Sequence, residues 1–221
     1  MKNRRLLIPL LILCLGAGLA NAAQKKISIS SFANDSWCGL SLFGCSTFQY
    51  GTKHYDGIAY TLLGNKKGTA NTAWFASVAA GQGSGTVSIT IPVNVAKVKT
   101  VYTLMNTEWG STQSGLITIT FTGSEGATWT FDPVGNVNIR DYNNGGYTNT
   151  CICQLPGAVG QSATINAWTN SAGQQRLDEQ VYELPAAFAT QTLESITITD
   201  SGGENIQRAI LTAVTVSTTS P

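Results

Sequence analysis

Apolar and small polar residues alternate along most of the chain after residue 25. A period of two, carried by Thr, Val and Ile, is typical of strands that bury one face. Clusters of Gly, Asn and Ser separate several of these stretches. One short helical turn is expected at 185–191, where a proline begins an alanine-rich stretch. The pattern predicts nine strands, at 26–30, 86–91, 98–104, 116–122, 127–131, 137–141, 164–168, 193–199 and 209–217.

Strands that follow one another about every ten residues, without long helical segments, predict an all-β fold. We expect a single domain over residues 23–221, an antiparallel β-sandwich of the jelly-roll type with about nine or ten strands. Composition agrees, because only 11% of the residues are charged and 43% are apolar. Threonine is β-branched and wettable, so it suits the outward positions of such sheets. This composition excludes a disordered chain, a coiled coil and a collagen-like rod.

Residues 1–22 have the features of a secretory signal peptide. A basic start, Lys2 to Arg5, precedes the apolar run 6–15, and a small-x-small triplet ends at Ala22. The run is too short to span a bilayer. Cleavage near Ala22 would take three of the 13 basic residues and leave ten against 12 acidic ones, a net charge of −2. We therefore expect a bacterial protein that is secreted or periplasmic, without a membrane span and without nucleic acid as a partner.

Loss of the leader would also remove Cys14 and leave four cysteines, Cys38, Cys45, Cys151 and Cys153. An even number in an oxidising compartment predicts two disulfides. Cys38 and Cys45 can close a short loop. Cys151 and Cys153 are two residues apart, which on an extended strand is at the edge of disulfide reach. Either that pair bends into a tight ring or the two loops are cross-linked to each other. Without a C-x-x-C spacing the four thiols make a poor zinc motif.

The segment 136–149 combines one Arg, one Asp, two Tyr and several Asn, and it begins as a predicted strand and ends in a loop. Amides, a guanidinium and a carboxylate hydrogen-bond sugar hydroxyls, and aromatic rings stack on the apolar face of a pyranose. Trp109 precedes a glycine in a predicted loop and could add such a ring. We therefore predict a ligand-binding site formed by Trp109, Arg140, Asp141, Tyr142, Asn144 and Tyr147.

The same segment also has purely structural interpretations. Asn144-Gly145 is a common hairpin turn, and Arg140 and Asp141 could form an ion pair that ties the loop down. Asp141 and Asn143 could instead ligate a structural calcium ion together with backbone carbonyls; no other cofactor is expected.

The tryptophans divide by their surroundings in the sequence. Trp129 and Trp168 lie in alternating strands and are expected in the core. Trp37 and Trp109 are better candidates for exposed platforms, and the position of Trp74 stays open.

Two parts of the sequence resemble a known family. The strand pair 193–200 and 207–216, joined by a glycine-containing turn, is similar to the closing hairpin of galactose-binding-like jelly-roll modules. The segment Tyr55 to Tyr60 is similar to their early strand. The resemblance covers about a third of the chain and implies a carbohydrate-binding or adhesive β-sandwich, often with a structural calcium ion, whose ligand lies in loops at one end.

Three functions follow from these observations. The first is an exported, non-catalytic β-sandwich that binds carbohydrate or another surface ligand. The second is a secreted structural or protein-interaction protein, or an effector, whose partner is a surface protein. The third is a glycan-cleaving enzyme that uses Glu108 and Asp141, since each of these acids stands beside an aromatic residue. Glu108 and Asp141 each stand singly along the chain, which favours binding over catalysis.

Residues 199–203 look like the nucleophile segment of chymotrypsin-like proteases. Too few residues follow Gly203 to form a specificity pocket, and a simple turn between two strands explains the segment.

Overall fold

The computed structural model describes residues 23–37, 48–65, 70–76, 85–109, 111–135, 137–143, 162–170, 175–202 and 207–218. These residues form twelve strands and one 3-10 helix, and none of their helices is long and apolar enough to cross a membrane. The strands are β1 (Gln24–Ile27), β2 (Gly51–Tyr55), β3 (Ile58–Leu62), β4 (Trp74–Phe75), β5 (Val87–Ala96), β6 (Thr100–Glu108), β7 (Ile117–Gly123), β8 (Thr128–Phe131), β9 (Ser162–Thr169), β10 (Arg176–Glu183), β11 (Thr192–Asp200) and β12 (Arg208–Ser217); the 3-10 helix is η2 (Ala186–Ala189).

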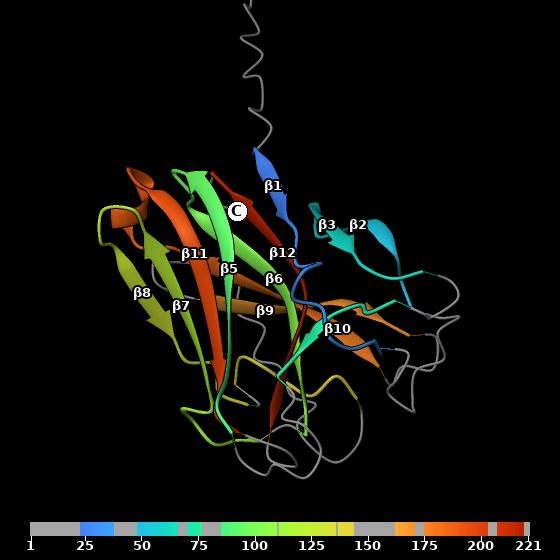
Figure 1. The fold of residues 1–221 in the computed structure, drawn as a ribbon. Coiled ribbons are helices and arrows are strands. Elements are labelled where there is room, and N and C mark those ends of the chain that lie inside the picture. The colour runs from blue at the N-terminus through green and yellow to red at the C-terminus, as the bar shows by residue number, and fades with distance from the viewer. Residues whose placement is uncertain are drawn as a thin grey trace, which may run out of the picture.

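The strands form two main antiparallel sheets in contact, so the predicted β-sandwich is confirmed (Figure 1). The six-stranded sheet has the order β1-β12-β6-β10-β9, and β4 also pairs with β12; the four-stranded sheet has the order β5-β11-β7-β8. From β4 to β12 the chain passes from sheet to sheet, except at the β7–β8 and β9–β10 pairs. This is the connectivity of a jelly roll. A separate two-stranded sheet, β2–β3, lies beside the six-stranded one.

The four-stranded sheet has one buried and one solvent-facing side, as alternation predicts. In β7, Ile117, Ile119 and Phe121 are fully buried in the core between the sheets. The residues between them face outward and belong to rows of threonines across the strands. One row consists of Thr90, Thr197, Thr120 and Thr130, which lie opposite one another in the register. Hydroxyl pairs in this row are 3.0 Å apart. The low charge of the chain therefore reflects the solvent-facing side of the four-stranded sheet, which is built from hydroxyls.

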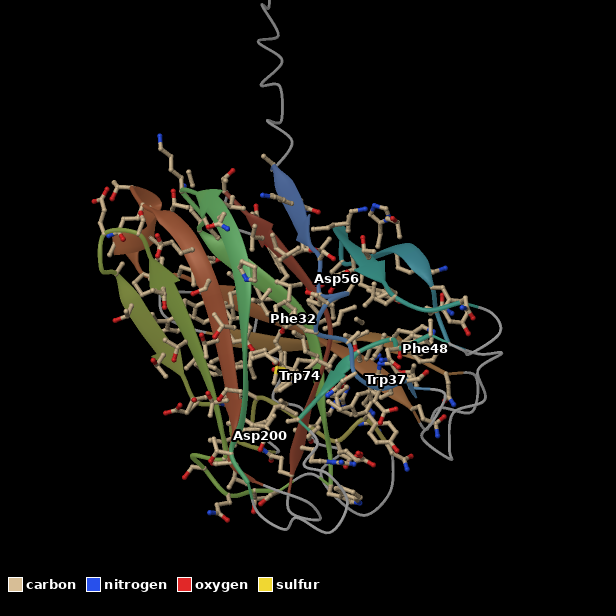
Figure 2. The ribbon with its side chains drawn as sticks, in the orientation of Figure 1. Phe32, Trp37, Phe48, Asp56, Trp74 and Asp200 are labelled. Carbon is tan, nitrogen blue, oxygen red and sulfur yellow. The ribbon has the colours of Figure 1, made fainter. Side chains whose placement is uncertain are left out.

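The central strands of the six-stranded sheet, β6, β10 and β12, are buried on both faces. Every described residue of β10 is buried, and β6 and β12 are buried along nearly their whole length. Beyond the core between the sheets, a second apolar cluster lies on the face turned away from the four-stranded sheet, which we call the outer face. Trp37 is fully buried there, and its ring is 5.9 Å from that of Phe48 (Figure 2). The interpretation of Trp37 as an exposed platform is therefore wrong.

Most predicted strands are present with small changes in their bounds, and η2 lies inside the predicted helical turn at 185–191. The predicted strand 137–141 is wrong. The N–H groups of Val137 and Asn138 both donate to the carbonyl of Val134 at 3.0 Å, and the Asn138 Oδ1 accepts the Val134 N–H at 2.6 Å. These bonds form a turn, and only isolated bridges follow it. The strand pattern also missed β2, β3, β4 and β10, and only the resemblance at Tyr55 to Tyr60 indicated a strand near β3.

Candidate functional site

Residues 140–143 lie between the ends of β6 and β10. The Thr107 N–H donates to the Arg140 carbonyl at 3.0 Å, and the Tyr142 N–H donates to the Thr107 carbonyl at 2.9 Å. On the other side, the Arg176 N–H donates to the Tyr142 carbonyl at 2.9 Å. The segment thus extends the six-stranded sheet where β6 and β10 separate. It brings two predicted site elements, Trp109 at the end of β6 and residues 140–142, to the same end of the sandwich.

Arg140 forms a bidentate ion pair with Asp178. Its Nε and Nη2 donate to the two carboxylate oxygens of Asp178 at 2.7 Å each, and Nη2 also donates to the Asn166 Oδ1 at 3.2 Å. The Asn106 side chain donates to Asp178 at 2.9 Å and accepts its backbone N–H at 3.1 Å. Burial raises the pKa of Asp178, and the Arg140 guanidinium opposes that shift. The ion pair that the structure shows thus joins Arg140 to β10, whereas the sequence suggested Asp141 as its partner.

Asp141 and Tyr142 are buried, each about 6% exposed. The Asp141 Oδ1 accepts the N–H of Asn143 at 2.7 Å, which closes a local turn. The Tyr142 ring meets that of Trp37 edge-on, with 5.3 Å between centroids. Burial raises the pKa of Tyr142, and the nearby carboxylates of Glu108 and Asp141 raise it further. These contacts fix the path of the chain as it enters the predicted loop and leave little of either side chain to solvent.

Trp109 lies at the rim of the same end and is partly exposed. Its φ is +51°, a left-handed conformation that a bulky residue rarely adopts. The Arg208 guanidinium lies 4.4 Å from the centre of the Trp109 ring, and Glu108 holds Arg208 through an ion pair of 2.6 Å. A cation over an aromatic face stabilises both groups. The indole is therefore fixed against β12 by charge and by backbone conformation.

Asp200, the last residue of β11 and labelled in Figure 2, stabilises this arrangement through the start of β12. Its carboxylate accepts the N–H of Gly202 at 2.7 Å and the N–H of Ala209 at 2.5 Å. Burial raises the pKa of Asp200, and these two bonds oppose the rise. Because Ala209 follows Arg208, the carboxylate fixes the first residues of β12. Residues 199–202 are thus held around a buried acid.

The remaining predicted site residues lie outside the described part of the chain. These are Asn144, Tyr147 and the four cysteines Cys38, Cys45, Cys151 and Cys153, so the binding role of the first two and both disulfides stay predictions. Within the described ranges, no group of three or more His, Cys, Asp and Glu side chains could hold a metal ion. Calcium binding through Asp141 and Asn143 likewise stays a prediction.

Sequence comparison does not place the chain in a family. No protein-family model matches the chain, and no curated protein matches it in a sequence comparison. The function must therefore be argued from the residues themselves.

Sequence reasoning missed Asp178, Asn106, Asn166 and Arg208, which hold the predicted residues in place. One signal was available for the first of them. The stretch 176–183 carries four charged side chains in eight residues of a chain in which 11% are charged. Such a cluster of charged residues in a sequence with few charges indicates a segment that forms ion pairs.

Proposed function

We propose that the protein is an exported carbohydrate-binding jelly roll that holds its ligand at the end of the sandwich where Trp109 lies. Export rests on the leader-like segment 1–22, and the mature protein is secreted or periplasmic. Carbohydrate binding without catalysis is favoured because Asp141 is buried and Glu108 is paired with Arg208. Neither acid has the open surroundings that a proton donor or nucleophile to a sugar needs.

The conformation of Trp109 carries the proposal. A non-glycine residue at positive φ costs of order 1–3 kcal/mol and persists where its surroundings enforce it, commonly at binding sites. Here the enforced feature is an indole at the rim, partly exposed, with Arg208 against one face. A tryptophan held rigid before binding loses little freedom when a sugar ring stacks on it. Trp109 is therefore assigned as the stacking platform.

The other predicted residues then have different roles. Arg140, Asp141 and Tyr142 position the chain that leads into the segment with Asn144 and Tyr147. Their contacts with Asp178, Asn143 and Trp37 occupy the groups that the sequence analysis assigned to the ligand. Asn144 and Tyr147 are the proposed polar and aromatic contacts that complete the site beside Trp109.

Replacement of Trp109 by alanine should weaken retention on the polysaccharide that the parent protein binds by at least about tenfold, equivalent to about 1.4 kcal/mol. The phenylalanine variant should retain part of the binding, because it keeps a ring. The measurement is a pull-down on insoluble cellulose, chitin, mannan and pectin, with a glycan array for soluble sugars.

Val137→Ala is the matched control. Val137 is an exposed apolar side chain, 45% accessible, close in sequence to the 140–143 segment. Its loss should leave retention unchanged. If the parent protein binds no glycan, or if Trp109→Ala binds as well as the parent, the proposal fails.

A further inference from the structure

The β2–β3 hairpin is attached to the six-stranded sheet by side chains rather than by a strand ladder. It forms its own two-stranded sheet beside β1 and β12 (Figure 1). The Gln24 side chain donates to the Gly57 carbonyl at 3.2 Å and accepts the Ala59 N–H at 3.0 Å. The Thr215 hydroxyl donates to the Ala59 carbonyl at 2.6 Å. Because an isolated two-stranded hairpin is marginally stable in water, undocking the hairpin should also unfold it.

A buried acid lies at the centre of this attachment. Glu179 of β10 is 1% exposed, and Tyr60 of β3, which is fully buried, donates its hydroxyl to the Glu179 Oε2 at 2.6 Å. On the neighbouring strands Glu179 stands opposite Leu104 and Ile165. The carboxyl group is therefore enclosed by apolar residues and covered by the phenol. Its access to water depends on whether the hairpin is docked.

Among the described residues, the groups that act on Glu179 supply no compensating positive charge. Tyr60 faces it from β3, and Tyr102 lies near it on β6. Asp56, labelled in Figure 2, acts on it from the hairpin turn. Tyr55 of β2 lies against the Tyr60 ring, with 6.1 Å between centroids. In the described part of the chain, no lysine, arginine or histidine contributes to the charge state of Glu179. Burial raises its pKa to about 7, Tyr60 opposes the shift, and the Asp56 carboxylate adds to it.

We infer that the β2–β3 hairpin is a pH-dependent latch, closed over a protonated Glu179 in mildly acidic surroundings and released more readily at neutral pH. Glu179 binds its proton more tightly when the hairpin is docked than when it is exposed, where the ordinary value of 4.5 applies. Docking of the hairpin is therefore most stable below the pKa that Glu179 has when it is exposed. This stability is lost as the pH rises through the pKa that Glu179 has under the docked hairpin. The equilibrium constant for opening of the hairpin should rise by about two orders of magnitude between these two pKa values and level off above the higher one. Opening uncovers apolar residues of the outer face.

Hydrogen exchange tests the latch. In the full chain, the protection factors of hairpin amides, corrected for the pH dependence of intrinsic exchange, should fall at least tenfold between about pH 5 and about pH 7.5. The Ala59 amide reports docking directly, since it donates to Gln24. In Glu179→Gln, an isosteric neutral variant, hairpin protection should not change with pH. Equal pH dependence in the parent and the variant overturns the proposal, as does a flat profile in the parent.

Glu183→Gln is the matched control. Glu183 is on the same strand, is also buried and has a raised pKa, but it accepts a hydrogen bond from Thr100 instead of holding the hairpin. This variant should keep the pH dependence of the hairpin. Asp56→Asn, at an exposed turn, should narrow the pH window by lowering the pKa of Glu179. If amides of β11 lose protection together with the hairpin, the opening is global and the latch is excluded.

Discussion

Replacement of Arg140 by leucine is expected to lower the free energy of unfolding by about 3–5 kcal/mol. The reason is the position of its partner, because the Asp178 side chain has no exposed surface while that of Arg140 is 11% exposed. Removal of one member of a buried pair leaves a charge without compensation, which costs far more than an exposed pair contributes. Urea unfolding with a two-state test measures the loss.

Two further measurements separate this explanation from simple loss of packing. Without the guanidinium, the pKa of Asp178 should rise further above its ordinary value, so the stability deficit should shrink as the pH falls and the carboxyl binds a proton. The double variant Arg140→Leu, Asp178→Asn should recover part of the loss, because the carboxylate that lost its guanidinium partner is replaced by a neutral amide. A deficit that is independent of pH, together with additive single and double variants, would contradict the buried-charge account.

Replacement of Trp37 by alanine should also destabilise the fold by about 3–5 kcal/mol. Trp37 is fully buried on the outer face, and its ring contacts those of Phe48, Phe75 and Tyr142 at 5.9, 5.7 and 5.3 Å. Its indole N–H donates to the Thr212 hydroxyl at 3.0 Å. Alanine would leave a large cavity at the junction of three rings and an unpartnered hydroxyl. Thermal and urea unfolding measure the effect.

Trp109→Ala is the comparison for this variant, since Trp109 lies partly exposed at the rim. Its loss should cost about 1 kcal/mol or less in stability. The two substitutions should therefore have different effects: loss of Trp37 should impair folding, and loss of Trp109 should impair binding. Similar stability losses in both variants would show that Trp109 is also a core residue, against the assignment made above.

The sequence predicted the four-stranded sheet well because that sheet obeys the rule on which the prediction rests. Its strands bury one face, so Ile and Phe alternate with Thr along β7, and Ile alternates with Thr in the second half of β11. The rule fails for β10, where both faces are buried and Asp178 and Glu179 occupy interior positions. From sequence alone, a carboxylate such as that of Asp178 is predicted to lie on the surface unless its partner is known. That partner, Arg140, lies 38 residues away in the chain.

The candidate site likewise contains one tryptophan whose exposure the sequence predicted and lies beside another whose burial it did not predict. Trp109 was recognisable from its place in a predicted loop before a glycine, and the structure leaves it partly exposed. Trp37 has a similar sequence environment, in a polar segment beside a cysteine, yet it is buried. The difference comes from residues distant in the sequence, Phe75 and Tyr142, which pack around Trp37. Burial decided by such long-range contacts leaves no local signature.

The burial of β6, β10 and β12 on both faces also has an evolutionary consequence. A substitution in β6 or β12 meets packed neighbours on either side, so few replacements are tolerated there. The outward threonines of the four-stranded sheet meet water and one another, and an exchange among Thr, Ser and Val costs little at such positions. Neutral sequence drift should therefore collect on one side of the molecule, while the other side changes slowly and in compensated pairs.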